Sequence, residues 1–274
     1  MRTRAFVMSA LTFAGCGGGG GTVSDPPDAA VVDGPLDGTP VIVPPNTSRI
    51  GTVQGVYLGS GTSQAQAGFY EEPMGAPGCA WSYGGGCTLT VCNSDAGLVA
   101  TSAGDIVFTT AGGSVTVVPD GSASYSASGP VPAMAPGTSV MVSGAGGAVP
   151  AFTSVPLVMP APVSVTAPEN HATISRAQPL MISWTATQGL AYVNVSQAPM
   201  PDAPYPAVYQ RTIRCELPAD QGGGEVPADF MNQLEPGNIA VSVTGLAVET
   251  VAAGDYAVKV RLLALDVTRQ LTVE

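Results

Sequence analysis

From Arg49 onward the chain consists of short runs in which apolar and polar residues alternate. Such alternation is typical of half-buried β-strands, and turn residues separate the runs about every eight to twelve positions. Glycine and proline supply these turns, with 35 and 25 residues, while only 11% of the residues are charged, which disfavours surface helices. The pattern predicts an all-β protein, an antiparallel sandwich or barrel. Strands are expected at residues 52–58, 65–70, 88–92, 105–110, 114–117, 139–143, 163–170, 179–184, 191–196, 209–215, 239–243, 256–262 and 266–274. The glycine-containing turns at 59–61 and 111–113 predict that the strands on either side of each turn pair as hairpins.

One segment breaks the alternation, Val226 to Leu234. Pro227 suits a first helical turn, and Phe230, Met231 and Leu234 share one helical face. We therefore expect one short helix there.

A proline-rich crossing at residues 150–162 divides the expected strands into two sets. So many prolines do not fit a central strand, so this stretch is an edge or a linker. Domains commonly contain about a hundred residues. We therefore expect two β-sandwich-like domains in tandem, at residues 49–159 and 160–274.

The start of the second unit carries a family resemblance. A strand beginning at Val163 ends in Pro168-Glu169-Asn170, and a later strand ends in Trp184, which alternates with Leu180 and Ile182. This pattern resembles immunoglobulin-like and fibronectin type III modules. The resemblance implies a β-sandwich with Trp184 in its core.

Residues 1–15 have the features of an export signal. Arg2 and Arg4 precede a ten-residue apolar run, which is too short to span a bilayer as a helix. Phe13-Ala14-Gly15-Cys16 resembles the lipobox of bacterial lipoproteins; an ordinary secretory signal is the alternative. The resemblance implies that Cys16 is acylated and becomes the first mature residue, and that Gly17 directs the protein to an outer membrane. We expect the protein in the cell envelope, lipid-anchored and facing the periplasm or the exterior.

The composition of residues 16–48 predicts a disordered tether. Five glycines follow Cys16, and residues 22–47 then mix aspartate with proline and lack a regular strand or helix period. A calcium site in this stretch would need a regular ligand spacing, which is absent.

The charge excludes one class of partner. The formal net charge of −11 becomes −13 once Arg2 and Arg4 are removed, and residues 50–175 hold no Lys or Arg. Such a chain repels nucleic acid, so no nucleic-acid partner is expected.

Four of the five cysteines remain after Cys16, namely Cys79, Cys87, Cys92 and Cys215. An even number in an exported protein favours disulfides. One bridge is expected within the first three, most readily through Cys79, while the partner of Cys215 stays open. A zinc site from these cysteines and His171 is the alternative, but it lacks the paired C-x-x-C spacing.

No residue pattern indicates catalysis. His171 is the only histidine and is expected in a solvent-facing turn, and acids that could pair as glycosidase carboxylates all lie in or beside turns. These acids are Glu71, Glu72, Asp95, Asp105 and Asp120.

The binding candidates are Trp81 and Tyr83, with Glu71 and Glu72 beside them. In an extended chain the two aromatic residues point to one face, where they suit stacking on a sugar ring or anchoring a partner protein. The alternative places them in the core of a short strand.

We therefore expect a non-enzymatic, lipid-anchored cell-envelope protein with a binding or structural role, without metal or cofactor. Its expected partners are the membrane, through the lipid, and a glycan or protein ligand. The alternative is a secreted hydrolase of polysaccharide that uses carboxylates of the first domain.

Overall fold

The computed structural model describes residues 49–58, 62–71, 79–93, 99–129, 134–197 and 209–274. Most of these residues lie in strands and very few in helices, which confirms the all-β prediction. The expected helix is also confirmed, as α1 (Ala228–Met231), with Pro227 at its N-cap and Phe230 and Met231 buried. A 3₁₀ turn, η1 (Ala219–Gln221), is also present. The signal, Cys16 and the tether lie outside the described residues.

Eleven strands form one large sheet, and nine of them follow the path β3-β4-β16-β15-β18-β19-β1-β2-β5. Strand β13 pairs with β19 and β8 pairs with β2, off this path. The bounds are β1 (Arg49–Tyr57), β2 (Ser63–Glu71), β3 (Cys79–Gly84), β4 (Cys87–Asn93), β5 (Val99–Ala100), β8 (Tyr125–Gly129), β13 (Thr173–Ile174), β15 (Leu190–Gln197), β16 (Tyr209–Pro218), β18 (Gly237–Ala253) and β19 (Tyr256–Val273).

Two smaller sheets accompany the large one. The first contains β6 (Ile106–Thr110), β7 (Gly113–Val117), β9 (Ser139–Gly144), β10 (Phe152–Thr153) and β11 (Leu157–Val158). The second contains β12 (Val165–Ala167), β14 (Leu180–Trp184) and β17 (Gly223–Val226). The expected hairpins β1–β2 and β6–β7 are both present as antiparallel pairs.

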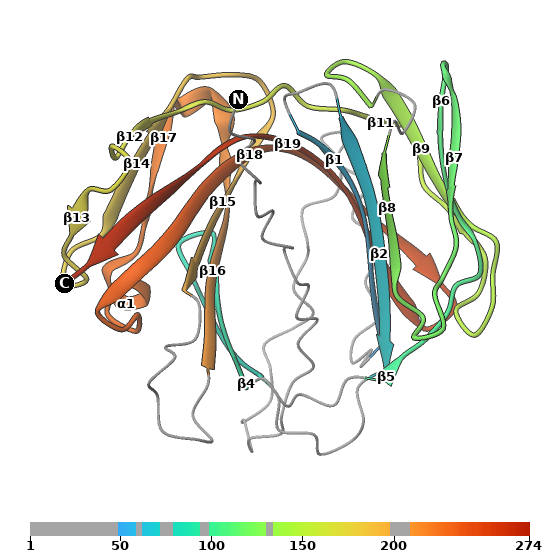
Figure 1. The fold of residues 1–274 in the computed structure, drawn as a ribbon, viewed down its shortest axis with the longest axis horizontal. Coiled ribbons are helices and arrows are strands. Elements are labelled where there is room, and N and C mark those ends of the chain that lie inside the picture. The colour runs from blue at the N-terminus through green and yellow to red at the C-terminus, as the bar shows by residue number, and fades with distance from the viewer. Residues whose placement is uncertain (1–48, 59–61, 72–78, 94–98, 130–133, 198–208) are drawn as a thin grey trace, which may run out of the picture.

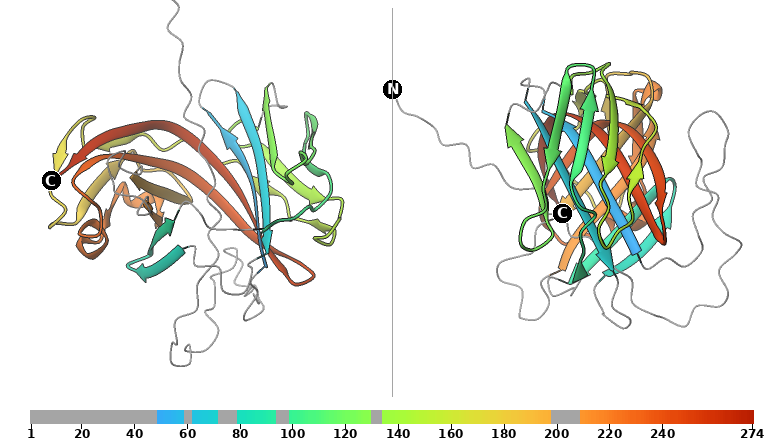
Figure 2. Two further views of the ribbon diagram at one scale, coloured as in Figure 1. Left: turned by 60° about the horizontal axis from the view of Figure 1, so that its bottom comes forward. Right: turned by 90° about the vertical axis from the view of Figure 1, so that its right-hand side faces the viewer.

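The hairpin of β18 and β19 is the longest feature of the fold, at 17 and 18 residues. The sequence predicted three separate short strands in this region, and the structure corrects this to two continuous ones. Gly254, at a φ of +60°, makes the connecting turn. Figure 1 shows the hairpin sweeping as an arch from one half of the molecule to the other, and Figure 2 shows shorter strands grouped at both ends of it.

Each end of the arch has its own hydrophobic core. One core gathers Trp184, Ile213 and Phe230 between the large sheet and β12-β14-β17, and Trp184 is only 3% exposed, as expected. The other gathers Phe69, Phe108 and β19 residues such as Val258 under the five-stranded sheet. These are the two sandwich-like units of the fold.

Strand pairing crosses the expected domain boundary at residue 159. Strand β4 precedes that residue but pairs with β16, and β1 pairs in parallel with β19. Both cores therefore contain strands from before and after the boundary.

Among the described residues, no helix has the length and apolar character needed to cross a bilayer.

Candidate functional site

The large sheet has one face that belongs to neither core. Along β19, Val258, Val260 and Leu262 point into a core, while the residues between them point the other way. A groove lies on this opposite face. It is lined by Gln54, Val56, Tyr192, Asn194, Arg214, Ser242, Thr244, Arg261, Leu263 and Leu265. We call these ten residues the groove, and the side of the sheet that carries them the groove face.

Five strands build the groove, because β1, β15, β16, β18 and β19 are neighbours in the sheet. Leu263 and Leu246 pack with Val56 and Tyr192 as a small apolar cluster on its floor. Gln54 brings an amide into this floor and is only 6% exposed. The groove thus combines an aliphatic base with polar side chains around it.

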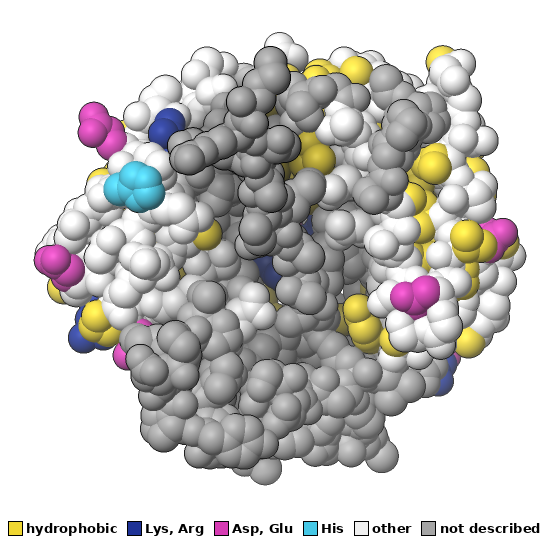
Figure 3. Space-filling view, in the orientation of Figure 1, with side chains coloured by type: hydrophobic (Ala, Val, Ile, Leu, Met, Phe, Trp, Pro, Cys, Tyr) yellow, Lys and Arg dark blue, Asp and Glu magenta, His cyan; other side chains and the backbone are white. Residues whose placement is uncertain are grey.

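Positive charge collects on the groove face. The guanidinium of Arg261 lies over the ring of Tyr192, with Cζ 5.4 Å from the ring centre. Its Nε is buried and makes no hydrogen bond within the described part of the chain. Arg214 also lines the groove. Figure 3 shows Lys or Arg side chains near the centre of this view of the molecule.

Lys259 lies on the same face and is paired. Its Nζ lies 3.1 Å from Glu216 Oε1, and each side chain is about one-third exposed (34% and 36%). Burial lowers the pKa of Lys259, the charge of Arg261 lowers it further, and Glu216 opposes both effects. The carboxylate of Glu216 is therefore already engaged by a neighbour.

Tyr83, one of the expected binding residues, is 78% exposed. The core alternative is therefore wrong for this residue. It lies opposite Thr88 in β4, and Thr88 lies opposite Arg214 in β16. Because directly paired residues point to the same face, Tyr83 belongs to the groove face, two strand spacings or about 10 Å from Arg214.

The other expected binding residues are less fully placed. Trp81 lies in β3 and its backbone pairs with Thr90 of β4, but its side chain lies outside the described part. Glu71 ends β2, close to the opposite end of the strand path from β3. Glu72 lies outside the described residues. Strand pairing therefore does not bring Glu71 beside the strand that carries the aromatic residues.

Cys87 and Cys215 form a disulfide across β4 and β16, with their Cα atoms 4.0 Å apart. The two residues are direct partners in the strand register, which resolves the open partner of Cys215. Zinc ligation by this pair is excluded, since both sulfurs are bonded to each other. The described residues also contain no cluster of three residues suited to a metal.

Cys79 and Cys92 lie directly opposite each other in β3 and β4. Their side chains lie outside the described part, so a bridge within the first three cysteines stays a prediction, now with Cys92 as the partner of Cys79.

His171 is exposed in a turn, as expected, with a φ of +65°. Its backbone N–H donates to the carbonyl of Gln270. Its position fits a structural role in a turn.

The proposed glycosidase acids are not shown as a pair. Asp105 and Asp120 are exposed, and Asp95 lies outside the described residues. Asp120 Oδ1 accepts hydrogen bonds from the Ser122 hydroxyl and from the backbone N–H groups of Ser122 and Ser124. These bonds, the hydroxyl first, lower the pKa of Asp120. The carboxylate of Asp120 therefore stabilises the turn in which it lies.

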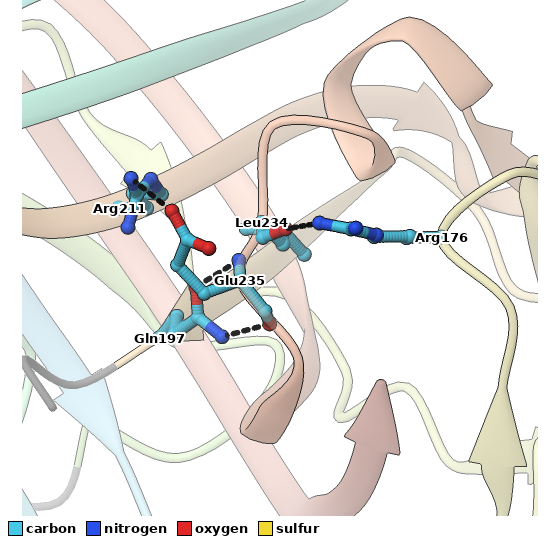
Figure 4. Close-up of polar contacts among 5 residues, drawn as sticks. All are labelled: Arg176, Gln197, Arg211, Leu234 and Glu235. Atoms are coloured by element: carbon cyan, nitrogen blue, oxygen red, sulfur yellow. Dashed lines mark hydrogen bonds and ion pairs between the residues drawn. The ribbon is translucent and has the colours of Figure 1, made fainter. Parts of the chain in front are cut away.

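A second polar cluster holds the loop after α1 (Figure 4). Gln197 Nε2 donates to the Glu235 carbonyl at 2.6 Å, and the Glu235 N–H donates to Gln197 Oε1 at 2.9 Å. Arg211 pairs with the Glu235 carboxylate at 2.9 Å, and Arg176 donates to the Leu234 carbonyl. Since these groups satisfy one another, we interpret the cluster as structural.

Comparison with known proteins gives no family. No family model matches the chain, and no curated protein matches it. A solved structure described as "Structural insight into host cell surface retention of a 1.5-MDa bacterial ice-binding adhesin" is similar at 17% identity, with a TM-score of 0.21. That similarity covers 84% of this chain and 66% of the other.

Sequence reasoning missed the groove. Its residues come from five strands spread between positions 54 and 265, and only the three-dimensional pairing assembles them. The signal in the sequence was local and weak: polar residues such as Arg261 at the outward positions of otherwise apolar strands.

Proposed function

We propose that this protein is a lipid-anchored cell-envelope protein whose folded part binds a ligand on the groove face. The lipobox-like segment ending at Cys16 supports the anchor. The observation that carries the binding role is the groove itself, a hollow with polar side chains over an apolar floor. Small-molecule sites commonly have this composition.

The exposed Tyr83 extends this binding face toward the sheet edge. A tyrosine ring is a large, amphipathic contact surface, and aromatic residues are enriched where proteins bind partners. At 78% exposure its ring contributes little to folding stability, so its position fits a contact with a ligand. Trp81 lies in the same strand, two residues before Tyr83.

The anchor is tested by fractionating cells that express the wild type or Cys16→Ser. We expect the wild type with the membranes, its N-terminal peptide carrying the mass of acyl chains, and the variant released in soluble form. Equal membrane retention of both proteins, with no acyl mass on Cys16, would refute the lipid anchor.

The binding role is tested by screening glycan arrays and envelope extracts with the wild type and with Tyr83→Ala and Trp81→Ala. We expect at least one reproducible ligand whose capture falls in the variants and in a groove variant, Arg261→Gln. Absence of any ligand, or capture that none of the three substitutions changes, would contradict the proposed binding face.

A further inference from the structure

The size of the groove limits what enters it. The hollow measures about 100 Å³, room for several water molecules by the usual requirement of about 10–15 Å³ each. A group of that size corresponds to a single ring or a short side chain. The ligand therefore inserts one unit and extends along the open face.

The charged residues that line the groove determine the charge of the ligand group that it can accept. The two charged residues that line it are Arg214 and Arg261, and within the described part of the chain no acid joins them. Glu216, a carboxylate on the groove face, is paired with Lys259. In a protein with a net charge of −11, this is a local site for an anion.

The identity of the cations favours a carboxylate. Arginine presents a planar set of donors that matches a carboxylate with two parallel hydrogen bonds. Arg261 has a buried Nε that lacks a partner among the described residues, and a buried donor without a hydrogen bond is costly. A carboxylate that accepts from the Nε–H and from one terminal N–H together would supply the missing partner.

The neutral lining favours a sugar ring around the carboxylate. Gln54, Asn194 and Ser242 offer short amide and hydroxyl groups that match ring hydroxyls. Leu263 and Val56 supply an aliphatic floor for the C–H face of the ring. Tyr83 stands on the same face, about 10 Å from Arg214, where an adjacent sugar unit would reach it.

We infer that the groove binds an acidic saccharide, with the carboxylate of one uronic acid unit held by Arg214 and Arg261. This assignment rests on the proposed binding function and deepens it by naming the ligand class.

The test uses the full chain carrying Cys16→Ser, with calorimetric titration of three probes. These are tetragalacturonate, its fully methyl-esterified form, and a tetraglutamate peptide of the same formal charge. We expect tetragalacturonate to bind, and the ester and the peptide to bind at least tenfold more weakly. Raising the salt concentration should weaken the binding of tetragalacturonate.

Variants then assign the site. Arg214→Gln and Arg261→Gln should each weaken tetragalacturonate binding at least tenfold, and Arg261→Lys should only partly restore it, because lysine keeps the charge but loses the paired donors. Arg49→Gln is the matched control: it removes a cation that pairs with Asp255 at the far end of the β18–β19 hairpin, and binding should not change. Thermal melts of all variants confirm folding.

Each outcome bears on a separate claim. Equal binding of the ester overturns the carboxylate assignment but leaves a saccharide-binding protein. Equal binding of the peptide overturns the saccharide assignment. Failure of all three probes, while the arrays still find a ligand on the groove face, overturns this inference and leaves the proposed function in place.

Discussion

Lys259 donates a hydrogen bond to Glu216 at 3.1 Å, although β18 and β15 lie between their strands in the sheet. Neighbouring strands are about 4.8 Å apart, so three steps in a flat sheet would separate β16 from β19 by about 14 Å. Glu216 lies across the ladder from Leu265 of β19, six residues along the strand from Lys259, which adds about 20 Å in a flat sheet. The pair therefore forms because the sheet bends toward the groove face. Arg261 of β19 likewise reaches across β18 to stack on Tyr192 of β15.

We predict that Glu216→Gln lowers the free energy of unfolding by about 1 kcal/mol. The value lies above that of an exposed pair and below that of a fully buried one, since both side chains are about one-third exposed (34% and 36%). Urea denaturation measures the change. Asp255→Asn is the control, because its pair with Arg49 is more exposed (79% and 43%), and it should cost less than about 0.5 kcal/mol. Equal effects of the two substitutions would argue against a bend held by this pair.

Lys259 should titrate below the ordinary lysine pKa of 10.5, because burial and the neighbouring Arg261 disfavour its charged form. Between its folded pKa and 10.5 the unfolded chain binds more protons, so this residue makes stability rise with pH across that window. Since Lys259 is the only lysine, its side-chain NMR signal needs no assignment. A midpoint at or above 10.5 would disprove the predicted shift, and Glu216→Gln should lower the midpoint further.

The local elements of this fold were predictable from the sequence, and the long-range ones were not. Alternation found the β6–β7 hairpin, and a proline followed by spaced apolar residues found α1, because neighbours in the chain determine both. The continuity of β18 was missed, since Leu246 and Ala247 interrupt the alternation with consecutive apolar residues. Both are apolar because the strand makes apolar contacts on both faces here: Leu246 packs on the groove floor, and Ala247 packs against a core on the other face.

The same distinction applies to the site. Tyr83 was found because an aromatic residue in a polar run is visible locally. Its relation to Arg214 depends on the pairing of β3, β4 and β16, which join segments more than a hundred residues apart. The expected acids beside Tyr83 were inferred from closeness along the chain, and strand order places Glu71 elsewhere.

Gln197→Ala should lower the free energy of unfolding by about 1–3 kcal/mol, the cost of leaving buried groups unpaired. The side chain is 3% exposed and exchanges two hydrogen bonds with the backbone of Glu235. Gln233→Ala is the control, because Gln233 is exposed and makes one weak bond to Asp229. Thermal and urea unfolding of both variants measure the difference. Similar stabilities would mean that the loop after α1 does not depend on this pairing.

The Cys87–Cys215 bridge should stabilise the protein by about 2–5 kcal/mol, because it closes a long loop and so restricts the unfolded chain. It joins residues 128 positions apart inside the core that contains Trp184. We expect a double variant, Cys87→Ala with Cys215→Ala, to unfold at lower urea than the wild type. Val193→Ala, a change in the same core opposite Cys215, controls for lost packing.

Adding reductant should destabilise the wild type strongly. Any remaining sensitivity of the double variant to reductant would report a bridge between Cys79 and Cys92, which closes a much shorter loop and stabilises less. Peptide mapping under non-reducing conditions identifies both bridges directly, and a wild type whose unfolding ignores reductant would contradict the stabilising role.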